Sequence, residues 1–252
     1  MAISDYMLMA AQRSDCLLAV VPANGISLVN PLRQDAALLQ VDPQSADSSP
    51  AERSGFVQRQ NIISENGFFQ SADPTIPAAI LTPLDMCGNQ TSKTFIAKVC
   101  CRAKKDGNLH ITPIFTQGFY PGGATVQTFH ITVWETASNS HIHTGVVLDN
   151  GEIKILTALT NDDFFDSFHV IGVVFNCNNS NNIMQQVIYI DGKMCNIGTC
   201  SNLPCHTPIT PYSDMRVNIR GEINTQYITD SYLTWAIVFD SALPPEEIQL
   251  FK

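Results

Sequence analysis

Short apolar stretches of five to eight residues, separated by turn-forming residues, recur along most of this chain. Helical periodicity is limited to residues 3–11 and to the last turn after Pro245. Many short strands bounded by Gly, Asn, Asp and Pro are typical of an antiparallel β-sandwich. We therefore predict an all-β fold that ends in a short helical turn. The expected strands include residues 94–101, 109–115, 128–134, 143–148, 152–156 and 232–239.

Two turns between these strands are strongly indicated. The pair Asn150-Gly151 predicts a tight hairpin, because both residue types accept positive φ angles. Residues 169–193 read as two strands around an Asn-rich loop, ended by Asp191-Gly192.

The length of 252 residues, 44% of them hydrophobic, suits one large domain. No internal repeat or change of composition divides the chain, so we expect a single domain over residues 1–252. Residues 1–60 would form an N-terminal arm and the first strand or strands. Within them, residues 32–60 have the composition of a surface excursion.

The charge pattern argues against several classes of partner. The formal net charge is −9, and the 14 Lys and Arg residues are scattered. Nucleic acids and anionic lipid surfaces are therefore not expected partners. No cationic segment precedes the apolar residues at the N-terminus, and no apolar run approaches the roughly 20 residues of a membrane span. We predict neither a secretory signal nor membrane insertion.

Eight cysteines raise the question of disulfides or a metal. Cys100 and Cys101 are adjacent in an expected strand, where their side chains point to opposite faces. A second group could in principle hold zinc: Cys177, Cys195, Cys200, Cys205 and His206. Its spacings match no common zinc motif, so thiols or one local disulfide are favoured over a metal site.

An ordered series of weak motifs runs through the C-terminal three quarters of the chain. They are residues 94–101 (TFIAKVCC), 114–118 (IFTQG), 167–174 (SFHVIGVV), 188–192 (IYIDG), 215–221 (MRVNIRG) and 236–248 (AIVFDSALPPEEI). In this order they resemble the concanavalin A-like jelly rolls of the laminin G and pentraxin type, over about residues 65–252. The resemblance implies that the last strand lies in the centre of a sheet beside the first. The short helix after it would seal the edge with Leu243, Ile248 and Leu250.

The chain departs from the family in its last strand. Trp235 and Ile237 stand where the family often has Glu and Arg, so a face that is normally wet becomes apolar. Either the N-terminal residues cover this face or a partner does. We assign Trp235 and Ile237 to a predicted partner interface.

Catalysis is not expected. Glucanases of this fold carry paired acids as Glu-x-Asp-x-x-Glu or a close variant on one strand, and no such string is present. The acidic group Asp162, Asp163 and Asp166 reads as a solvated loop. We predict that the chain is not an enzyme.

The sequence indicates metal sites less clearly. Calcium is the family's common ligand, and two groups could contribute to it: Asp162, Asp163 and Asp166, or Asn176, Asn178 and Asn179. Solvated loops are the favoured reading, so no metal is assigned. His141 and His143 share a strand face, which suits a metal only if a third ligand converges.

A sugar ligand would use aromatic rings and amides. Phe119 and Tyr120, with Trp134 nearby in sequence, could stack on sugar rings. The predicted ligand-binding residues are Phe119, Tyr120, Asn178 and Asn179.

Two functional hypotheses follow. The first is a non-enzymatic structural protein, a virion surface or capsid decoration component, that contacts other subunits of an assembly as a homo-oligomer and is located in the virion. The alternative is a lectin-like module that binds a cell-surface or extracellular polysaccharide.

Overall fold

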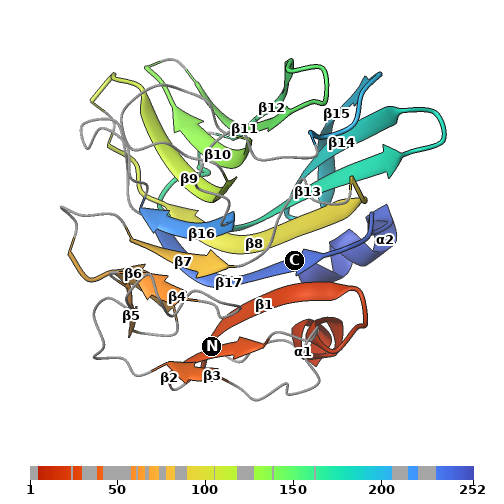
Figure 1. The fold of residues 1–252 in the computed structure, drawn as a ribbon. Helices are drawn as coiled ribbons and strands as arrows, with labels where there is room; N and C mark the ends of the chain where they lie inside the picture. The colour runs from red at the N-terminus through yellow and green to blue at the C-terminus, as the bar shows by residue number, and fades with distance from the viewer. Residues whose placement is uncertain are drawn as a thin grey trace.

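The computed structural model describes residues 5–23, 25–29, 39–41, 58–60, 62–65, 68–73, 78–82, 90–104, 106–117, 128–137, 139–161, 163–205, 215–220 and 231–252. Nearly all of its elements are strands (Figure 1). The strands are β1 (Cys16–Ala23), β2 (Gly25–Val29), β3 (Leu39–Val41), β4 (Gln58–Gln60), β5 (Ile62–Glu65), β6 (Phe68–Ser71), β7 (Ala78–Thr82), β8 (Lys93–Cys101), β9 (His110–Gln117), β10 (Phe129–Glu135), β11 (Ser140–Val147), β12 (Ile153–Leu159), β13 (Phe168–Asn178), β14 (Ile183–Ile190), β15 (Lys193–Cys200), β16 (Met215–Arg220) and β17 (Ser231–Phe239). The helices are α1 (Asp5–Ala11), α2 (Pro245–Ile248) and the 3-10 turn η2 (Gln249–Phe251).

The strands form two antiparallel sheets. A ten-stranded sheet has the order β15-β14-β13-β8-β17-β1-β2-β3, with β6 on β17 and β5 on β6. A seven-stranded sheet has the order β12-β11-β10-β9-β16-β7-β4. The predicted antiparallel sandwich is confirmed, and the strands expected between residues 94 and 156 all form. No described helix is long and apolar enough to cross a membrane.

The closing strand lies in the centre of its sheet, as the resemblance implied. β17 pairs with β1 on one side and with β8 on the other, and Val238 is opposite both Leu18 and Phe95. Its alternating side chains are therefore buried on both faces of the sheet.

Phenylalanine rings fill the space between the sheets. The ring of Phe95 lies 4.7 Å from Phe129, 5.3 Å from Phe115 and 6.0 Å from Phe175, centre to centre. All four side chains have no more than 1% of their surface exposed. Each contributes about 1.5–3 kcal/mol by leaving water. Because two rings come from each sheet, this cluster fixes how the sheets stack.

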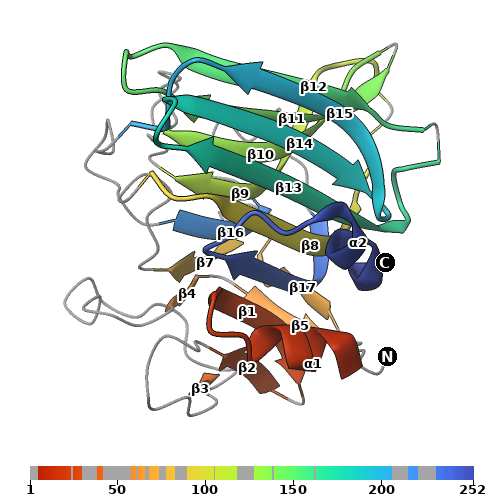
Figure 2. The same cartoon turned by 90° about the vertical axis from the view of Figure 1, so that its right-hand side faces the viewer.

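Helices cover the outer face of the ten-stranded sheet (Figure 2). Trp235 and Ile237 lie in a second apolar cluster with residues of α1, α2 and η2. The ring centre of Phe251 lies 5.9 Å from that of Trp235 and 4.9 Å from that of Tyr6 on α1. Of the two alternatives for this face, the chain's own terminal residues cover it. Trp235 and Ile237 are thereby enclosed within the chain, at 8% and 0% exposure, and present no open surface to a partner.

The C-terminal seal differs in one residue from the expectation. Leu243 and Ile248 are buried as predicted, but Leu250 is 54% exposed. The 3-10 turn rotates Phe251 inward in its place, where it is 4% exposed. Pro245 occupies the first turn of α2, where it is tolerated, and Glu246 and Glu247 beside it complement the helix dipole.

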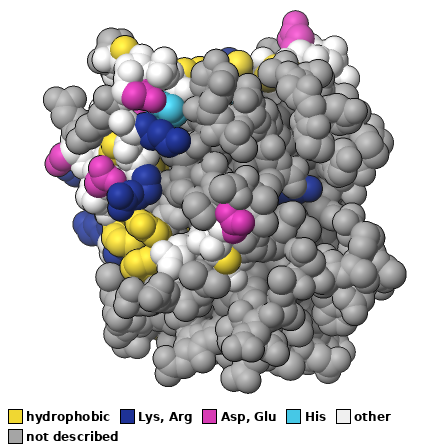
Figure 3. Space-filling model, turned by 90° about the vertical axis from the view of Figure 1, so that its left-hand side faces the viewer, with side chains coloured by type: hydrophobic (Ala, Val, Ile, Leu, Met, Phe, Trp, Pro, Cys, Tyr) yellow, Lys and Arg dark blue, Asp and Glu magenta, His cyan; other side chains and the backbone are white. Residues whose placement is uncertain are grey.

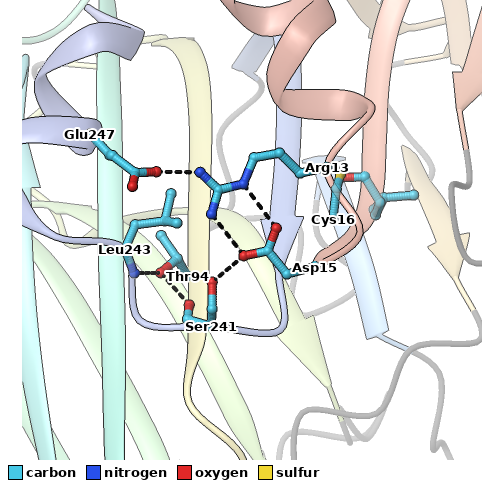
Figure 4. Close-up of polar contacts among 8 residues, drawn as sticks. Arg13, Asp15, Cys16, Thr94, Ser241, Leu243 and Glu247 are labelled. Carbon is cyan, nitrogen blue, oxygen red and sulfur yellow. Dashed lines mark hydrogen bonds and ion pairs between the residues drawn. The ribbon is translucent and has the colours of Figure 1, made fainter.

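A polar cluster ties the N-terminal segment to the C-terminal helix (Figure 4). Arg13 donates two hydrogen bonds to Asp15, at 2.8 and 2.9 Å, and pairs with Glu247. Ser241 donates to Asp15 at 2.6 Å. The hydrogen bonds from Arg13 lower the pKa of the Asp15 carboxyl to about 2. The two chain ends are thus joined by charge as well as by apolar contact.

The two predicted hairpin turns form with different geometry. Asp191 and Gly192 both have positive φ, at 50° and 76°, and join β14 to β15 as a tight turn. At the other hairpin only Gly151 is in this region, with φ of 83°, so the expectation of positive φ at Asn150 was wrong. Its side chain instead bonds to Glu152, which supports a different turn.

Candidate functional site

The outer face of the seven-stranded sheet carries an unusual set of rings. Along β10, Phe129, Ile131 and Val133 point into the core. His130 and Trp134 therefore point the other way, because successive side chains of a strand alternate. Figure 3 turns toward the viewer the left-hand side of Figure 1, where β9 and β10 lie. Its coloured side chains include apolar, acidic and basic ones and a histidine. Neither sign of charge therefore dominates the described part of this view.

The neighbouring strand β11 adds two histidines to the same face. In the antiparallel register Trp134 is opposite His141, and His130 is opposite Gly145. The missing side chain at Gly145 makes room for the imidazole of His130, since a Cβ there would lie 2.2 Å from its Cε1. His143 falls between the two rings of β10.

Three of these rings form a stack. Trp134 and His143 have centres 4.4 Å apart and planes 13° from parallel. His143 and His130 follow at 5.0 Å and 11°. The ring centre of His141 lies 5.7 Å from that of Trp134, with the two rings tilted. We call Trp134, His143 and His130 the ring stack.

Hydrogen bonds hold the ring stack in place. Trp134 Nε1 donates to Thr132 Oγ1 at 2.8 Å, and that hydroxyl donates to the carbonyl of His143 at 3.2 Å. Nε2 of His130 lies 2.8 Å from Nδ1 of His143. Nδ1 of His130 is buried without a partner. A buried N–H without a partner is rarer than a buried acceptor without one, so we assign the hydrogen to Nε2 of His130. His143 then accepts at Nδ1 and carries its own hydrogen on Nε2.

The imidazoles of this face are uncharged near neutral pH. Burial, and next the charge of His143, lowers the pKa of His130 to about 3. Burial, and next the charge of His141, lowers the pKa of His143 to about 4. Burial also lowers the pKa of His141. The face thus offers flat ring surface and neutral N–H donors.

These histidines do not form a metal site in the structure. Besides His141, the imidazole that approaches His143 is that of His130. His130 and His143 each use one ring nitrogen in the hydrogen bond between them. Within the described ranges, no group of three His, Cys, Asp or Glu side chains is arranged to hold a metal ion. Cys177, Cys195 and Cys200 are free thiols, Cys205 is buried, and His206 lies outside the described residues.

The residues predicted to bind a ligand are placed as follows. Phe119 and Tyr120 lie outside the described residues. Asn178 and Asn179 are exposed at the tip of the β13–β14 hairpin, where the Asn178 side chain accepts a hydrogen bond from the backbone of Asn181. Of the acidic loop, Asp162 also lies outside, whereas Asp166 pairs with Arg102 at 3.3 Å.

His130 was not among the residues expected from the sequence. His141, His143 and Trp134 were noted there, but not the histidine that shares β10 with Trp134. The signal was present, because His130, Thr132 and Trp134 alternate with core residues. What the alternation does not give is the register that sets His130 opposite Gly145.

A second cluster resembles the Ser-His-Asp triad of hydrolytic enzymes. Ser167 Oγ lies 2.9 Å from His169 Nε2, and His169 Nδ1 lies 2.7 Å from Asp191. However, the single hydrogen of Ser167 has the backbone carbonyl of Asp163, at 2.7 Å, as an alternative acceptor to the imidazole nitrogen. Asp191 also accepts from the Val170 backbone. These contacts fasten the β14–β15 turn to β13, which is a structural role.

Comparison with known proteins gives the fold but no family. No family model and no curated sequence matches this chain. The binding domain of botulinum neurotoxin DC in complex with SialylT superposes with a TM-score of 0.57 and 10% identity, covering 94% of this chain and 50% of that one. The sialidase of Trypanosoma rangeli in complex with sialic acid superposes with a TM-score of 0.56 and 11% identity, covering 95% and 33%.

A third, weaker match is the Ruminococcus gnavus IT-sialidase CBM40 bound to α2,3-sialyllactose. Its TM-score is 0.46 at 12% identity, with 64% of this chain and 81% of that chain covered. The chain thus spans about half the length of the toxin domain and a third of the sialidase. At these identities, the two matches with TM-scores above 0.5 show a shared β-sandwich fold alone.

Proposed function

We propose that this protein is a non-catalytic, glycan-binding module of the concanavalin A-like jelly-roll kind, related to laminin G-like and pentraxin-like domains. The observation that carries the proposal is the ring stack on the outer face of the seven-stranded sheet. Sugars are recognised by aromatic rings that pack on their C–H faces, together with a few fixed polar groups that set orientation.

The exposed end of the stack has both kinds of group. Trp134 and His141 are half-buried and lie opposite one another on β10 and β11. Thr157 of β12 is exposed and stands opposite His143. A sugar could therefore rest on Trp134 and His141 and exchange hydrogen bonds with Thr157 and the neutral imidazoles. Because these imidazoles carry no charge, the expected ligand is a neutral sugar unit.

The shared fold supports this proposal without carrying it. The toxin domain and the sialidase are known in complex with SialylT and sialic acid. The transfer of a glycan ligand to this chain rests on the ring stack.

A glycan array, followed by titration calorimetry of the strongest hit, tests the proposal. Trp134→Ala should weaken binding about tenfold or more, since an aromatic contact contributes about 0.5–1.5 kcal/mol beyond the area it buries and about 1.4 kcal/mol is a factor of ten. Asn178→Ala and Tyr120→Ala serve as matched variants at the sites favoured by sequence. Loss of binding in those variants but not in Trp134→Ala would move the site away from the ring stack. Absence of any saturable hit, with and without calcium, would refute the function.

The virion hypothesis loses one of the observations that favoured it. An apolar face at Trp235 and Ile237 was expected to meet a partner, and α1, α2 and η2 cover that face. A role as a virion surface or decoration component stays a prediction, to be tested by the mass and composition of the native assembly.

A further inference from the structure

One side of the sandwich gathers most of the exposed large apolar side chains of the described residues. β12 carries Ile153, Ile155 and Leu159, exposed by 49%, 48% and 72%. The adjacent strand β15 carries Met194 and Ile197, exposed by 60% and 48%. β12 and β15 are the outermost strands of their sheets and lie together at the top of Figures 1 and 2.

The backbone of β12 has a free side. No described strand pairs with β12 except β11. The N–H of Thr160 donates to the C=O of Ser140, and the C=O of Leu156 accepts from the hydroxyl of Thr144 on β11. Even-numbered residues of β12 therefore direct their backbone groups toward β11. Odd-numbered residues then direct theirs to the free edge, because successive residues alternate. Asn196 reaches one of these, the carbonyl of Thr157.

Little in β12 protects this edge. Proteins protect edge strands with prolines, bulges or charges. β12 has no proline, and its register with β11 is unbroken from residue 153 to 159. Its one charged residue, Lys154, lies opposite Val146 near one end of the strand, so the inward charge that discourages pairing is confined to that end. Residues 155–161 contain no charged side chain.

We propose that a second copy of this chain binds antiparallel along β12, so that the two seven-stranded sheets join into one. The free-edge residues are odd-numbered on both copies and must pair with each other. A two-fold axis at Leu156, the middle of the strand, lets all seven residues overlap. Ile153 is then opposite Leu159 of the second copy, and Ile155 is opposite its Thr157.

A second copy fits this edge for reasons of pattern and charge. Apolar and β-branched pairs on one face are favourable cross-strand partners. The register sets Lys154 opposite Ala158 of the second copy, which avoids contact between like charges. With a net charge of −9 on each copy, an uncharged strand is a suitable place for self-association. Met194 and Ile197, opposite Tyr189 and Val187, lie on the outer face of the ten-stranded sheet and take no part in this pairing.

Sedimentation velocity and light scattering across a concentration series test the proposal. The wild-type protein should have a mass of twice 27.7 kDa. Leu159→Lys and Ile155→Lys should raise the dissociation constant at least about 100-fold, because each substitution enters the interface twice. Met9→Lys, at a residue 65% exposed on α1, is the matched control and should stay dimeric. Leu159 is exposed in the monomer, so its replacement should leave the near-ultraviolet circular dichroism unchanged.

Hydrogen exchange gives a second readout at the backbone. The N–H groups of Ile155, Thr157 and Leu159 should be protected in the wild-type dimer and exchange rapidly in the Leu159→Lys monomer. A wild-type protein that is monomeric at the highest concentration, or a dimer that Leu159→Lys leaves intact, overturns the proposal. Ile155 stands opposite Gly145 and away from His141, so glycan binding is expected in the wild type and in the Ile155→Lys monomer, and a failure of the dimer is separable from a failure of the glycan site.

Discussion

Replacing Gln186 by methionine should stabilise this protein. Gln186 lies on β14 and faces the space between the sheets, opposite Phe175 on β13 and Gly198 on β15. Its exposed fraction is 0%, and neither its amide nitrogen nor its oxygen has a hydrogen-bond partner. The chain therefore keeps a complete side-chain amide in an apolar core.

The size of the effect follows from this environment. A buried polar group without a partner costs about 1–3 kcal/mol. Methionine is close to glutamine in length and volume, so it should leave neither a cavity nor a clash. We expect the free energy of unfolding to rise by about 2 kcal/mol. For a chain of this size, that raises the melting temperature by about 4–8 °C.

Thermal melts and urea titrations of the wild type and Gln186→Met measure the change. The urea midpoint should rise while the slope with denaturant stays constant. Gln185→Met is the matched control, since Gln185 is the preceding residue of β14 and points to the opposite, half-buried face. Its effect should be within about 0.5 kcal/mol.

A neutral or destabilising result for Gln186→Met would refute the reasoning. The amide would then have a partner in solution, such as a trapped water molecule, and removing it would cost a real hydrogen bond.

Three further outcomes are expected. The free energy of unfolding should fall as the pH decreases from about 6.5 to about 4, because the unfolded chain takes up protons that folded His130 and His143 do not. One pKa unit corresponds to about 1.4 kcal/mol, so the loss is on the order of 3 kcal/mol for each of the two imidazoles. Urea titrations across this range measure it, and His130→Gln should flatten the profile. Phe251→Ala should cost about 3 kcal/mol and the neighbouring Leu250→Ala less than about 0.5 kcal/mol in thermal melts, because only the first is buried. A fluorophosphonate probe should not label Ser167, and labelling there would contradict the structural reading of its cluster.

Local patterns carried much of the fold. The alternation of apolar residues along 128–134 and 143–148 predicted paired strands, and Asp191-Gly192 predicted a tight turn, because both depend on backbone geometry that neighbouring residues set. The strand at 232–239 and the helical turn after it were also readable in this way. The residues of the candidate site were predictable only in part: His141, His143 and Trp134 were noticed, whereas their association with His130 was not.

The remaining decisions belong to the tertiary structure. A period of two shows which residues share a face, but not which strand lies beside them or what covers the face. The register of β10 on β11 brought His130 over Gly145 and completed the ring stack. The packing of α1 and η2 enclosed Trp235 and Ile237. Sequence by itself determined that the chain makes alternating strands with a helical end, because those properties are local; contacts between distant segments decided where its rings meet and which apolar residues remain exposed.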